Sequence, residues 1–383
     1  MKLIALPKLY TSKDLTGISV ITDLIDKVKA LSNITDTHCD IFLPSDQTHY
    51  RWDNQTFNPS YFKEVRMLDN REYKITHPVP APMVVDWLVK NWDYDFLFNL
   101  SYECSAYLKN ATVKNASRFN VPLKRRVITY LTETHADPKL PHLSDESGKW
   151  RILASLMSGP TFVQTEQDFL AIKNLAKKIS PSERVKAMAN LSILRPCIDL
   201  NRIDFESCEQ SRESRSSENK PMTLFHGGSL EGKRNLNEMQ KVLARVAHRG
   251  VKGLILTQSE RKSPFESSIE YRPSTNRQAY LDALHEGDIL WCMSDYEGTG
   301  LAYMEAIASG MIPIILRSTW MMERIPSDYP YIVDKPEKAD RVLISILKNP
   351  KKAKEQANRV RNKIIEGWNS DAVGLTFHRK YKE

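Results

Sequence analysis

Two glutamates, Glu297 and Glu305, stand eight residues apart around a Gly-Thr-Gly turn in the stretch "DYEGTGLAYMEAIASGMIPII". Carboxylates accept hydrogen bonds from hydroxyl groups, and they stabilise positive charge when a fold brings them to a ligand. The second glutamate lies in a predicted helix that begins at Thr299 and is followed by an apolar strand over 312–316. What these acids can do depends on where each one points.

The predicted helix places Glu305 at the edge of its apolar face. At about 100° per residue, one arc of the helix holds four apolar side chains, which are Leu301, Met304, Ile307 and Ala308. Glu305 lies on the border of that arc, whereas Tyr303 and Ala306 point away from it. A carboxylate in such a position needs hydrogen-bond donors, and the hydroxyl groups of a ligand would supply them.

The turn between the two acids is suited to a phosphate. Gly298 and Gly300 let backbone amides approach a ligand closely, and the start of the helix offers free N–H groups and the positive end of its dipole. The sequence therefore predicts a phosphate at these amides, with acids on either side that bind sugar hydroxyls. The alternative is structural, with Glu297 as a helix-capping residue and Glu305 as a boundary residue.

Apolar runs that alternate with helical patterns must position this turn. Such alternation predicts an α/β fold with parallel sheets and crossover helices, whose ligands bind at the carboxyl ends of the strands. The aromatic, irregular segment 47–75 fits this alternation least, and we interpret it as an insertion or a divergent βαβ piece. The segments predicted as strands are 2–6, 39–44, 94–100, 125–131, 161–165, 191–196, 222–228, 252–257, 289–294 and 312–316.

The length of 383 residues predicts two domains. A polar, serine-rich stretch at 205–221 is typical of a linker or a long loop. It separates a predicted Rossmann-like domain over 1–204 from a second one over 222–363, and residues 364–383 are expected to cross back to the first domain. The simplest architecture is two doubly wound α/β domains that face each other across a cleft.

Composition narrows the class of protein. Charged residues make up 27% and apolar residues 41%, which is typical of a folded soluble chain, and no apolar run approaches the ~20 residues of a membrane span. The first residues lack the apolar core and cleavage site of a signal peptide. Five scattered cysteines, none in a Cys-x-x-Cys pair, indicate free thiols in a reducing compartment. We expect a cytoplasmic protein, located in the host cytoplasm if it is viral.

The acidic motif resembles that of GT-B-fold glycosyltransferases of the family-4 type, which retain the anomeric configuration of the sugar. Their motif is an acid, seven residues and a second acid, followed by small residues and a proline. The matching positions here are Glu297, Glu305, Ala306, Ala308, Gly310 and Pro313. The resemblance implies that Glu305 holds the nucleotide ribose and that the Glu297 loop lines the transferred sugar. It also implies that the donor phosphates bind the amides of Gly298, Thr299, Gly300 and Leu301.

A second segment, "LFHGGSLEGKRNL", resembles the cationic clamp of the same family, in which a glycine and an arginine are followed five residues later by a lysine. Gly227 and Lys233 occupy the glycine and lysine positions, but Gly228 stands where the family has arginine. Arg234 is the candidate for the second positive charge. A leaving diphosphate needs such charge, especially in the absence of a metal ion. The alternative is an exposed Lys-Arg pair at the start of a helix.

Two further candidates come from the first predicted domain. The segment "VITYLTETHAD" resembles the strand ending in a histidine that family members place beside the sugar. This makes His135 a candidate to bind a hydroxyl group or carry a proton, although a structural histidine is the alternative. Near the start, "DLTGIS" stands where the family has its first strand-to-helix glycine loop, and Gly17 is the candidate there.

No metal ion or other cofactor is expected, because glycosyltransferases of this type generally need none. The pair Asp93 and Asp95 in "WDYDF" has the form of a metal-binding Asp-x-Asp. It opens a predicted strand of the first domain, far in sequence from the donor motif, so we assign it no metal.

The resemblance implies transfer of a hexosyl or pentosyl group from a nucleotide diphosphate sugar, with retention of the anomeric configuration. The distribution of charged residues indicates what kind of acceptor receives the sugar. The net charge is +8, and residues 109–126 hold six basic residues and no acid. This run, with Lys124, Arg125 and Arg126 at its end, could bind the backbone of duplex DNA. Some phage glycosyltransferases of this fold modify hydroxymethylated bases in DNA, and such a base is the favoured acceptor.

Three alternatives stay open. The acceptor can be an envelope lipid or polysaccharide, with the basic surface resting on an anionic membrane. A sugar-nucleotide epimerase shares the fold and the donor-site chemistry but needs no acceptor. A non-catalytic binding module would keep the fold and could lose the acids, and the intact pair Glu297 and Glu305 argues against it.

Overall fold

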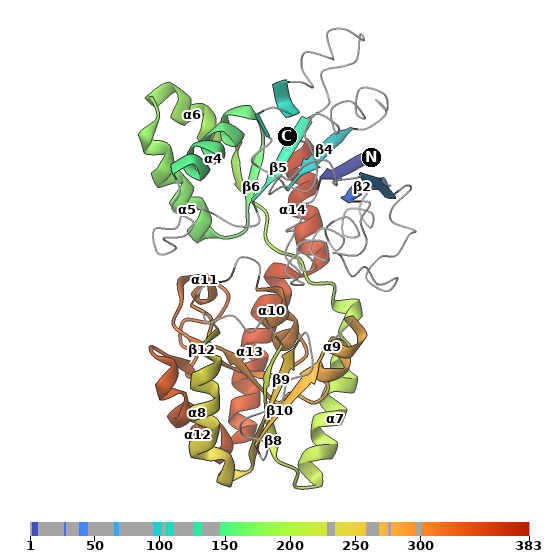
Figure 1. The fold of residues 1–383 in the computed structure, drawn as a ribbon, viewed down its shortest axis with the longest axis vertical. Helices are drawn as coiled ribbons and strands as arrows, with labels where there is room; N and C mark the ends of the chain where they lie inside the picture. The colour runs from blue at the N-terminus through green and yellow to red at the C-terminus, as the bar shows by residue number, and fades with distance from the viewer. Residues whose placement is uncertain are drawn as a thin grey trace. The chain divides into compact units, whose positions relative to one another are not determined.

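The computed structural model shows two compact units, each built around its own parallel sheet (Figure 1). One unit comprises Met1–Pro196 together with Val373–Glu383, and the other comprises Cys197–Ala372. The residues that the structure describes are 2–6, 27, 38–44, 65–68, 95–100, 105–106, 108–110, 126–131, 146–227, 234–257, 268–274, 277–295, 297 and 300–382.

In the first unit, seven described strands form one sheet in the order β3-β2-β1-β4-β5-β6-β7, and every pairing is parallel. The helices α4, α5 and α6 lie together beside β6 (Figure 1). The strands are β1 (Lys2–Leu6), β2 (His38–Pro44), β3 (Val65–Leu68), β4 (Phe96–Asn99), β5 (Arg126–Tyr130), β6 (Thr161–Val163) and β7 (Leu191–Ile193). The helices are α4 (Glu146–Ser158), α5 (Glu166–Leu175) and α6 (Pro181–Asn190).

In the second unit, six described strands follow the order β10-β9-β8-β11-β12-β13, again all parallel. In both sheets the chain starts in the middle, runs to one edge and then crosses to the other side, which is the doubly wound order of Rossmann-like domains. The predicted α/β fold with parallel sheets is therefore confirmed. The strands are β8 (Met222–His226), β9 (Val251–Thr257), β10 (Ile269–Pro273), β11 (Ile289–Cys292), β12 (Ile312–Leu316) and β13 (Ile332–Val333).

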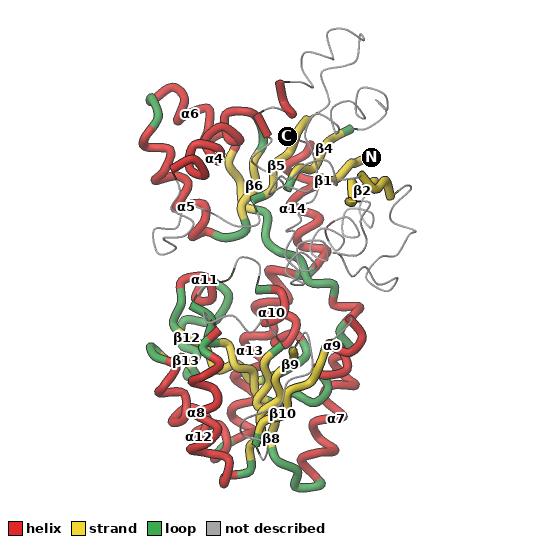
Figure 2. Tube along the Cα trace, in the orientation of Figure 1, coloured by secondary structure: helices red, strands yellow, loops and turns green. Residues whose placement is uncertain are grey.

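Helices cover both faces of the second sheet, as the red and yellow segments of Figure 2 show. In Figure 1, α8 and α12 lie on one side of the strands, and α7 and α9 lie on the other. α10 follows β11 and packs against both β11 and α13. The helices are α7 (Phe205–Ser217), α8 (Leu236–Val246), α9 (Arg277–Leu284), α10 (Leu301–Ala308), α11 (Thr319–Met322), α12 (Ala339–Lys348) and α13 (Pro350–Trp368).

The last helix belongs to the first unit from Val373 onward. α13 ends at Trp368, which is buried in the core of the second unit, and α14 (Ser370–Lys382) follows it. Phe377 of α14 packs against Phe98 of β4 and Phe162 of β6, with ring centroids 5.7 and 5.6 Å away. These aromatic contacts make α14 part of the core around β4 and β6.

Residues 205–217, which we predicted to be part of a linker or long loop, form the helix α7. Asp204 caps its start by accepting a hydrogen bond from the Ser207 amide at 2.9 Å. The prediction was wrong because it relied on the serine-rich composition and overlooked three residues at helical spacing that face inward. These residues are Phe205, Cys208 and Arg212.

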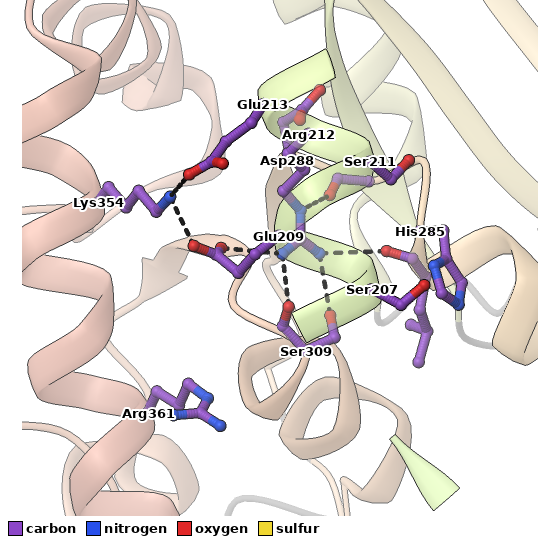
Figure 3. A network of polar contacts seen from close by, with 12 residues as sticks. Ser207, Glu209, Ser211, Arg212, Glu213, His285, Asp288, Ser309, Lys354 and Arg361 are labelled. Atoms are coloured by element: carbon purple, nitrogen blue, oxygen red, sulfur yellow. Dashed lines mark hydrogen bonds and ion pairs between the residues drawn. The ribbon is translucent and has the colours of Figure 1, made fainter. Parts of the chain in front are cut away.

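Arg212 ties α7 to the carboxyl ends of α9 and α10 (Figure 3). Its guanidinium donates hydrogen bonds of 2.5 to 3.1 Å to the backbone carbonyls of Leu284, Gly287 and Ser309. From α13, Arg361 donates a hydrogen bond of 2.8 Å to the Ala308 carbonyl. The last carbonyls of a helix have no partner within it, and positive charge there also favours the negative end of the helix dipole. The carboxyl end of α10 is therefore fixed by two arginines.

Replacing Arg212 by methionine should lower the free energy of unfolding by about 3 kcal/mol, because backbone carbonyls of two helix ends lose their charged donor. Urea denaturation followed by circular dichroism measures this change. Arg249→Met, at an exposed position of the same unit, is the matched control and should change stability by less than about 0.5 kcal/mol. Equal urea midpoints for the two variants would contradict the anchoring role of Arg212.

α10 is buried on nearly all sides, which differs from the single apolar face that we predicted. Tyr303 is 1% exposed and Ala306 is fully covered, although both were expected to point away from the core. The reason is that α13 and β11 both pack against this short helix. A helix whose residues are small or apolar all round is typical of such a position.

Candidate active site

The two segments predicted to carry the site meet at the carboxyl ends of β8 and β11. β8 ends at His226 and is followed by Gly227, whereas β11 ends at Cys292 and leads to α10 through residues 293–300. The two strands are neighbours in the sheet, and the strand order reverses between them. Ligands of doubly wound sheets bind outside the carboxyl ends of the strands at such a reversal.

Glu297 lies in the turn before α10 and is held by two side chains. The Ser294 hydroxyl donates a hydrogen bond to Glu297 Oε1 at 2.6 Å, and the Arg234 guanidinium forms an ion pair with the same oxygen. Glu297 is only 8% exposed. A charge in such a place needs a partner of opposite sign, and Arg234 supplies it.

Arg234 is placed by contacts with the end of β11. The indole nitrogen of Trp291 donates a hydrogen bond to the Arg234 carbonyl at 3.3 Å. Asn235 follows in a left-handed conformation with φ 55°, and its side-chain amide donates to the Met293 carbonyl at 2.8 Å. Asparagine adopts this conformation more readily than most residues. The turn before α8 is thereby fixed on β11, with the Arg234 side chain on Glu297.

Tyr303 of α10 contacts the Arg234 guanidinium in two ways. Arg234 Nη1 donates a hydrogen bond to the Tyr303 hydroxyl at 3.1 Å, and the guanidinium carbon lies 5.4 Å from the centroid of the ring. The ring also packs against His226 and Trp320, at centroid distances of 6.2 and 5.7 Å. Burial raises the pKa of the Tyr303 phenol; the positive charge of Arg234 opposes this rise, and the negative charge of Glu297 adds to it. Tyr303 therefore stays neutral at ordinary pH.

Gly300 precedes the first residue of α10 and has a left-handed backbone with φ 62°. A Cβ atom at this position would lie 2.8 Å from a ring carbon of Trp320 and 3.3 Å from Nη1 of Arg324. Trp320 donates a hydrogen bond from its indole nitrogen to the Ser294 carbonyl at 3.1 Å. Because these side chains fill the space beside the turn, only glycine fits there.

Glu305 lies one turn into α10 and is 3% exposed, and Leu301 at the start of the helix is buried as well. The first amides of a helix have no partner within it, so they can bind an anion. In the chain, these amides stand between Glu297 and Glu305. The roles that we predict for the two acids and for the amides stay predictions.

The structure describes six of the twelve predicted catalytic and donor-binding residues, and they lie at the end of one sheet. Those in the second unit are Gly227, Arg234, Glu297, Gly300, Leu301 and Glu305. Arg126 is the first residue of β5 in the first unit. The remaining candidates lie outside the described residues, and they are Gly17, Lys124, Arg125, His135, Gly228, Lys233, Gly298 and Thr299.

Four residues that shape the site were not predicted from the sequence, namely Ser294, Tyr303, Trp320 and Arg324. The signal for Tyr303 was its phenol in a helix whose other residues, apart from Glu305, are apolar, because a buried phenol usually has a polar partner. Ser294 precedes Glu297 by three residues, which is within reach of a turn. Trp320 and Arg324 follow β12 in the chain, and only the fold brings them to the turn before α10.

No protein-family model matches the sequence, and no curated protein matches it. Solved structures match over the whole chain. HepE from Anabaena in complex with UDP and glucose gives a TM-score of 0.68 at 11% identity, with 100% of both chains covered. Sucrose-phosphate synthase from Thermosynechococcus elongatus gives 0.67 at 13% identity, with 100% of this chain and 98% of that chain covered. The trehalose-6-phosphate synthase OtsA gives 0.67 at 10% identity, with 100% and 99% covered.

The chain has the GT-B fold. The likeness confirms the predicted pair of Rossmann-like domains, and at these identities it establishes the fold and not the reaction. Over the part of the chain that the structure describes, no helix is long and apolar enough to cross a membrane. The same part holds no group of three or more His, Cys, Asp or Glu side chains placed to bind a metal ion.

Proposed function

We propose that the chain is a glycosyltransferase that moves a sugar from a nucleotide diphosphate sugar to an acceptor, with retention and without a metal ion. The observation that carries the proposal is the Arg234–Glu297 ion pair before α10, at the reversal of strand order. Positive charge and free helix amides suit a diphosphate. HepE binds UDP and UDP-glucose in its solved complexes, so a protein of this fold carries the proposed type of ligand.

In this reaction the bond between the anomeric carbon and the diphosphate oxygen breaks, and its electron pair leaves with the diphosphate. The acceptor hydroxyl oxygen forms the new bond to that carbon on the same face, and its proton passes to an oxygen of the leaving diphosphate. The amides at the start of α10, together with Arg234, stabilise the departing negative charge. Glu297 stabilises the positive charge that develops on the sugar, and Glu305 holds the ribose hydroxyls.

The proposed acceptor is a hydroxymethylated base in duplex DNA. Its support is the basic run 109–126, which carries six positive charges and no acid and ends at Arg126, the first residue of β5. Clustered positive charge attracts the phosphate backbone, and the attraction weakens as salt rises. An anionic membrane surface would be attracted by the same charge, so the acceptor has to be decided by experiment.

Incubating the protein with a panel of nucleotide sugars, and measuring nucleotide release, tests the function. We expect one donor to release its nucleoside diphosphate faster when DNA containing hydroxymethylated bases is present, with sugar attached to the DNA. Conversion of a nucleotide sugar to its epimer without an acceptor would identify an epimerase instead. Failure of every donor to bind would refute a donor site at the carboxyl ends of β8 and β11.

Neutralising Lys124, Arg125 and Arg126 together should abolish a salt-sensitive mobility shift of duplex DNA, because three phosphate contacts are lost. A gel-shift titration at two salt concentrations measures the effect. The matched control neutralises three exposed cations of the other unit, Lys351, Lys352 and Arg249. Binding of the unaltered protein to anionic liposomes but not to DNA would favour a membrane-bound acceptor.

A further inference from the structure

We propose that Tyr303 is a positioning residue that fixes Arg234 against Glu297, and that this arrangement selects donors carrying a second phosphate group. The inference rests on the proposed function and concerns the same site. Gly228 leaves the expected arginine position without charge, so Arg234 needs another means of alignment. The contacts of Tyr303 provide it.

A single guanidinium nitrogen makes both contacts. Arg234 Nη1 pairs with Glu297 Oε1 and donates to the Tyr303 hydroxyl at 3.1 Å. The side chains of Arg234 and Glu297 are only 11% and 9% exposed. In such a place water screens charge weakly, so the direction of each hydrogen bond matters more than at the surface. The phenol therefore helps to hold the positive charge against Glu297.

Electrostatics explains why the alignment matters for a diphosphate. A carboxylate beside the amides of α10 would repel a phosphate that approaches them. Arg234 offsets part of the charge of Glu297, so the helix amides attract the anion with less opposition from that carboxylate. A guanidinium that turned away from Glu297 would leave this repulsion in place. Tyr303 thus acts on the ligand through Arg234.

The Tyr303 ring is itself held in place. His226 at the end of β8 and Trp320 in α11 pack against it at centroid distances of 6.2 and 5.7 Å. The indole of Trp320 is fixed by its hydrogen bond to the Ser294 carbonyl. Because burial raises the pKa of the phenol, Tyr303 keeps one charge state, and so the same contact with Arg234, across the pH range in which an enzyme is assayed.

Tyr303→Phe tests the proposal because it keeps the ring and removes only the acceptor oxygen. Tyr329→Phe is the matched control: Tyr329 is buried in the same unit, and its hydroxyl donates a hydrogen bond of 2.7 Å to the Pro313 carbonyl on β12. Both variants lose one buried hydrogen bond, so urea denaturation should show similar losses of stability. The two tyrosines differ in that Tyr303 contacts Arg234, whereas the hydroxyl of Tyr329 binds the Pro313 carbonyl.

The readout is the ratio of affinities for a nucleoside diphosphate and its monophosphate, measured by calorimetry on the full chain. The probes are UDP and UMP, ADP and AMP, and GDP and GMP, and the pair that the unaltered protein binds is used. Tyr303→Phe should weaken the diphosphate about 5- to 10-fold and the monophosphate less than about 2-fold, as expected for one misaligned charged contact. Tyr329→Phe should change neither.

Two results would overturn the inference. Equal weakening of diphosphate and monophosphate by Tyr303→Phe would show a general structural effect, and unchanged binding of both would show that the phenol has no part. In either case the unaltered protein still binds its nucleotide, and the proposed function stands. If the unaltered protein binds no diphosphate at all, both the inference and the proposed function fail.

Discussion

Replacing Glu297 by glutamine should lower the rate of sugar transfer about 100- to 1,000-fold, the loss typical of removing one electrostatic group at a reacting centre. Glutamine keeps the size of the side chain and can still accept a hydrogen bond from Ser294, but it carries no negative charge for the sugar. Donor affinity should stay the same or increase, because Arg234 no longer has a carboxylate to neutralise. Single-turnover rates and donor dissociation constants measure the two effects separately.

The matched comparison for Glu297 is Glu305, which lies one turn into α10, the helix that follows Glu297, and is buried as well. Glu305→Ala should mainly weaken nucleotide binding, since the ribose hydroxyls lose their acceptor, and the rate with bound donor should change less. If both variants slowed transfer equally, with no difference in binding, the assignment of separate roles to the two acids would be wrong.

α10 can carry this chemistry because both of its ends are fixed. At its carboxyl end, Arg212 and Arg361 bind the carbonyls of Ser309 and Ala308. At its amino end, Trp320 packs close to Gly300 and donates a hydrogen bond to Ser294. A site held by rigid elements on several sides keeps its charged groups in place for a ligand.

Strands could be predicted from the sequence where an apolar segment is continuous. Residues 2–6 and 312–316 were predicted as strands with the bounds that β1 and β12 have, because the inner strands of a parallel sheet are continuous apolar runs. β10, with the sequence "IEYRP", was not predicted. It lies at the edge of its sheet, where polar side chains can point into solvent, so its sequence lacks a strong strand signal.

The site could be predicted from the sequence only where its residues lie close together in the chain. Glu297 and Glu305 belong to one strand–turn–helix segment, and Arg234 was recognised as a possible second charge. The contact of Arg234 with Tyr303 joins residues 69 positions apart, and helical periodicity placed Tyr303 on the wrong side. Such contacts depend on how α10 is buried between neighbours, which a single helix pattern does not contain.

Replacing Arg234 by methionine should weaken the binding of a nucleoside diphosphate about 100-fold, because the variant loses a positive charge and also removes the ion-pair partner of the nearly buried Glu297 carboxylate. Methionine keeps an unbranched chain of similar length, so packing changes little. Calorimetric titration with the diphosphate that the unaltered protein binds measures the loss. Lys252→Met, in β9 of the same sheet, is a control without a contact to Glu297.

The double variant Arg234→Met with Glu297→Gln separates the two causes of this loss. If Arg234 acts partly by neutralising Glu297, removing the carboxylate as well should restore about 10-fold of the affinity, since residues in direct contact show non-additive effects. Sugar transfer should stay slow, because the charge for the sugar is absent. Additive losses of affinity in the double variant would mean that Arg234 acts on the diphosphate alone, and the Arg234–Glu297 pair would then not be one functional unit.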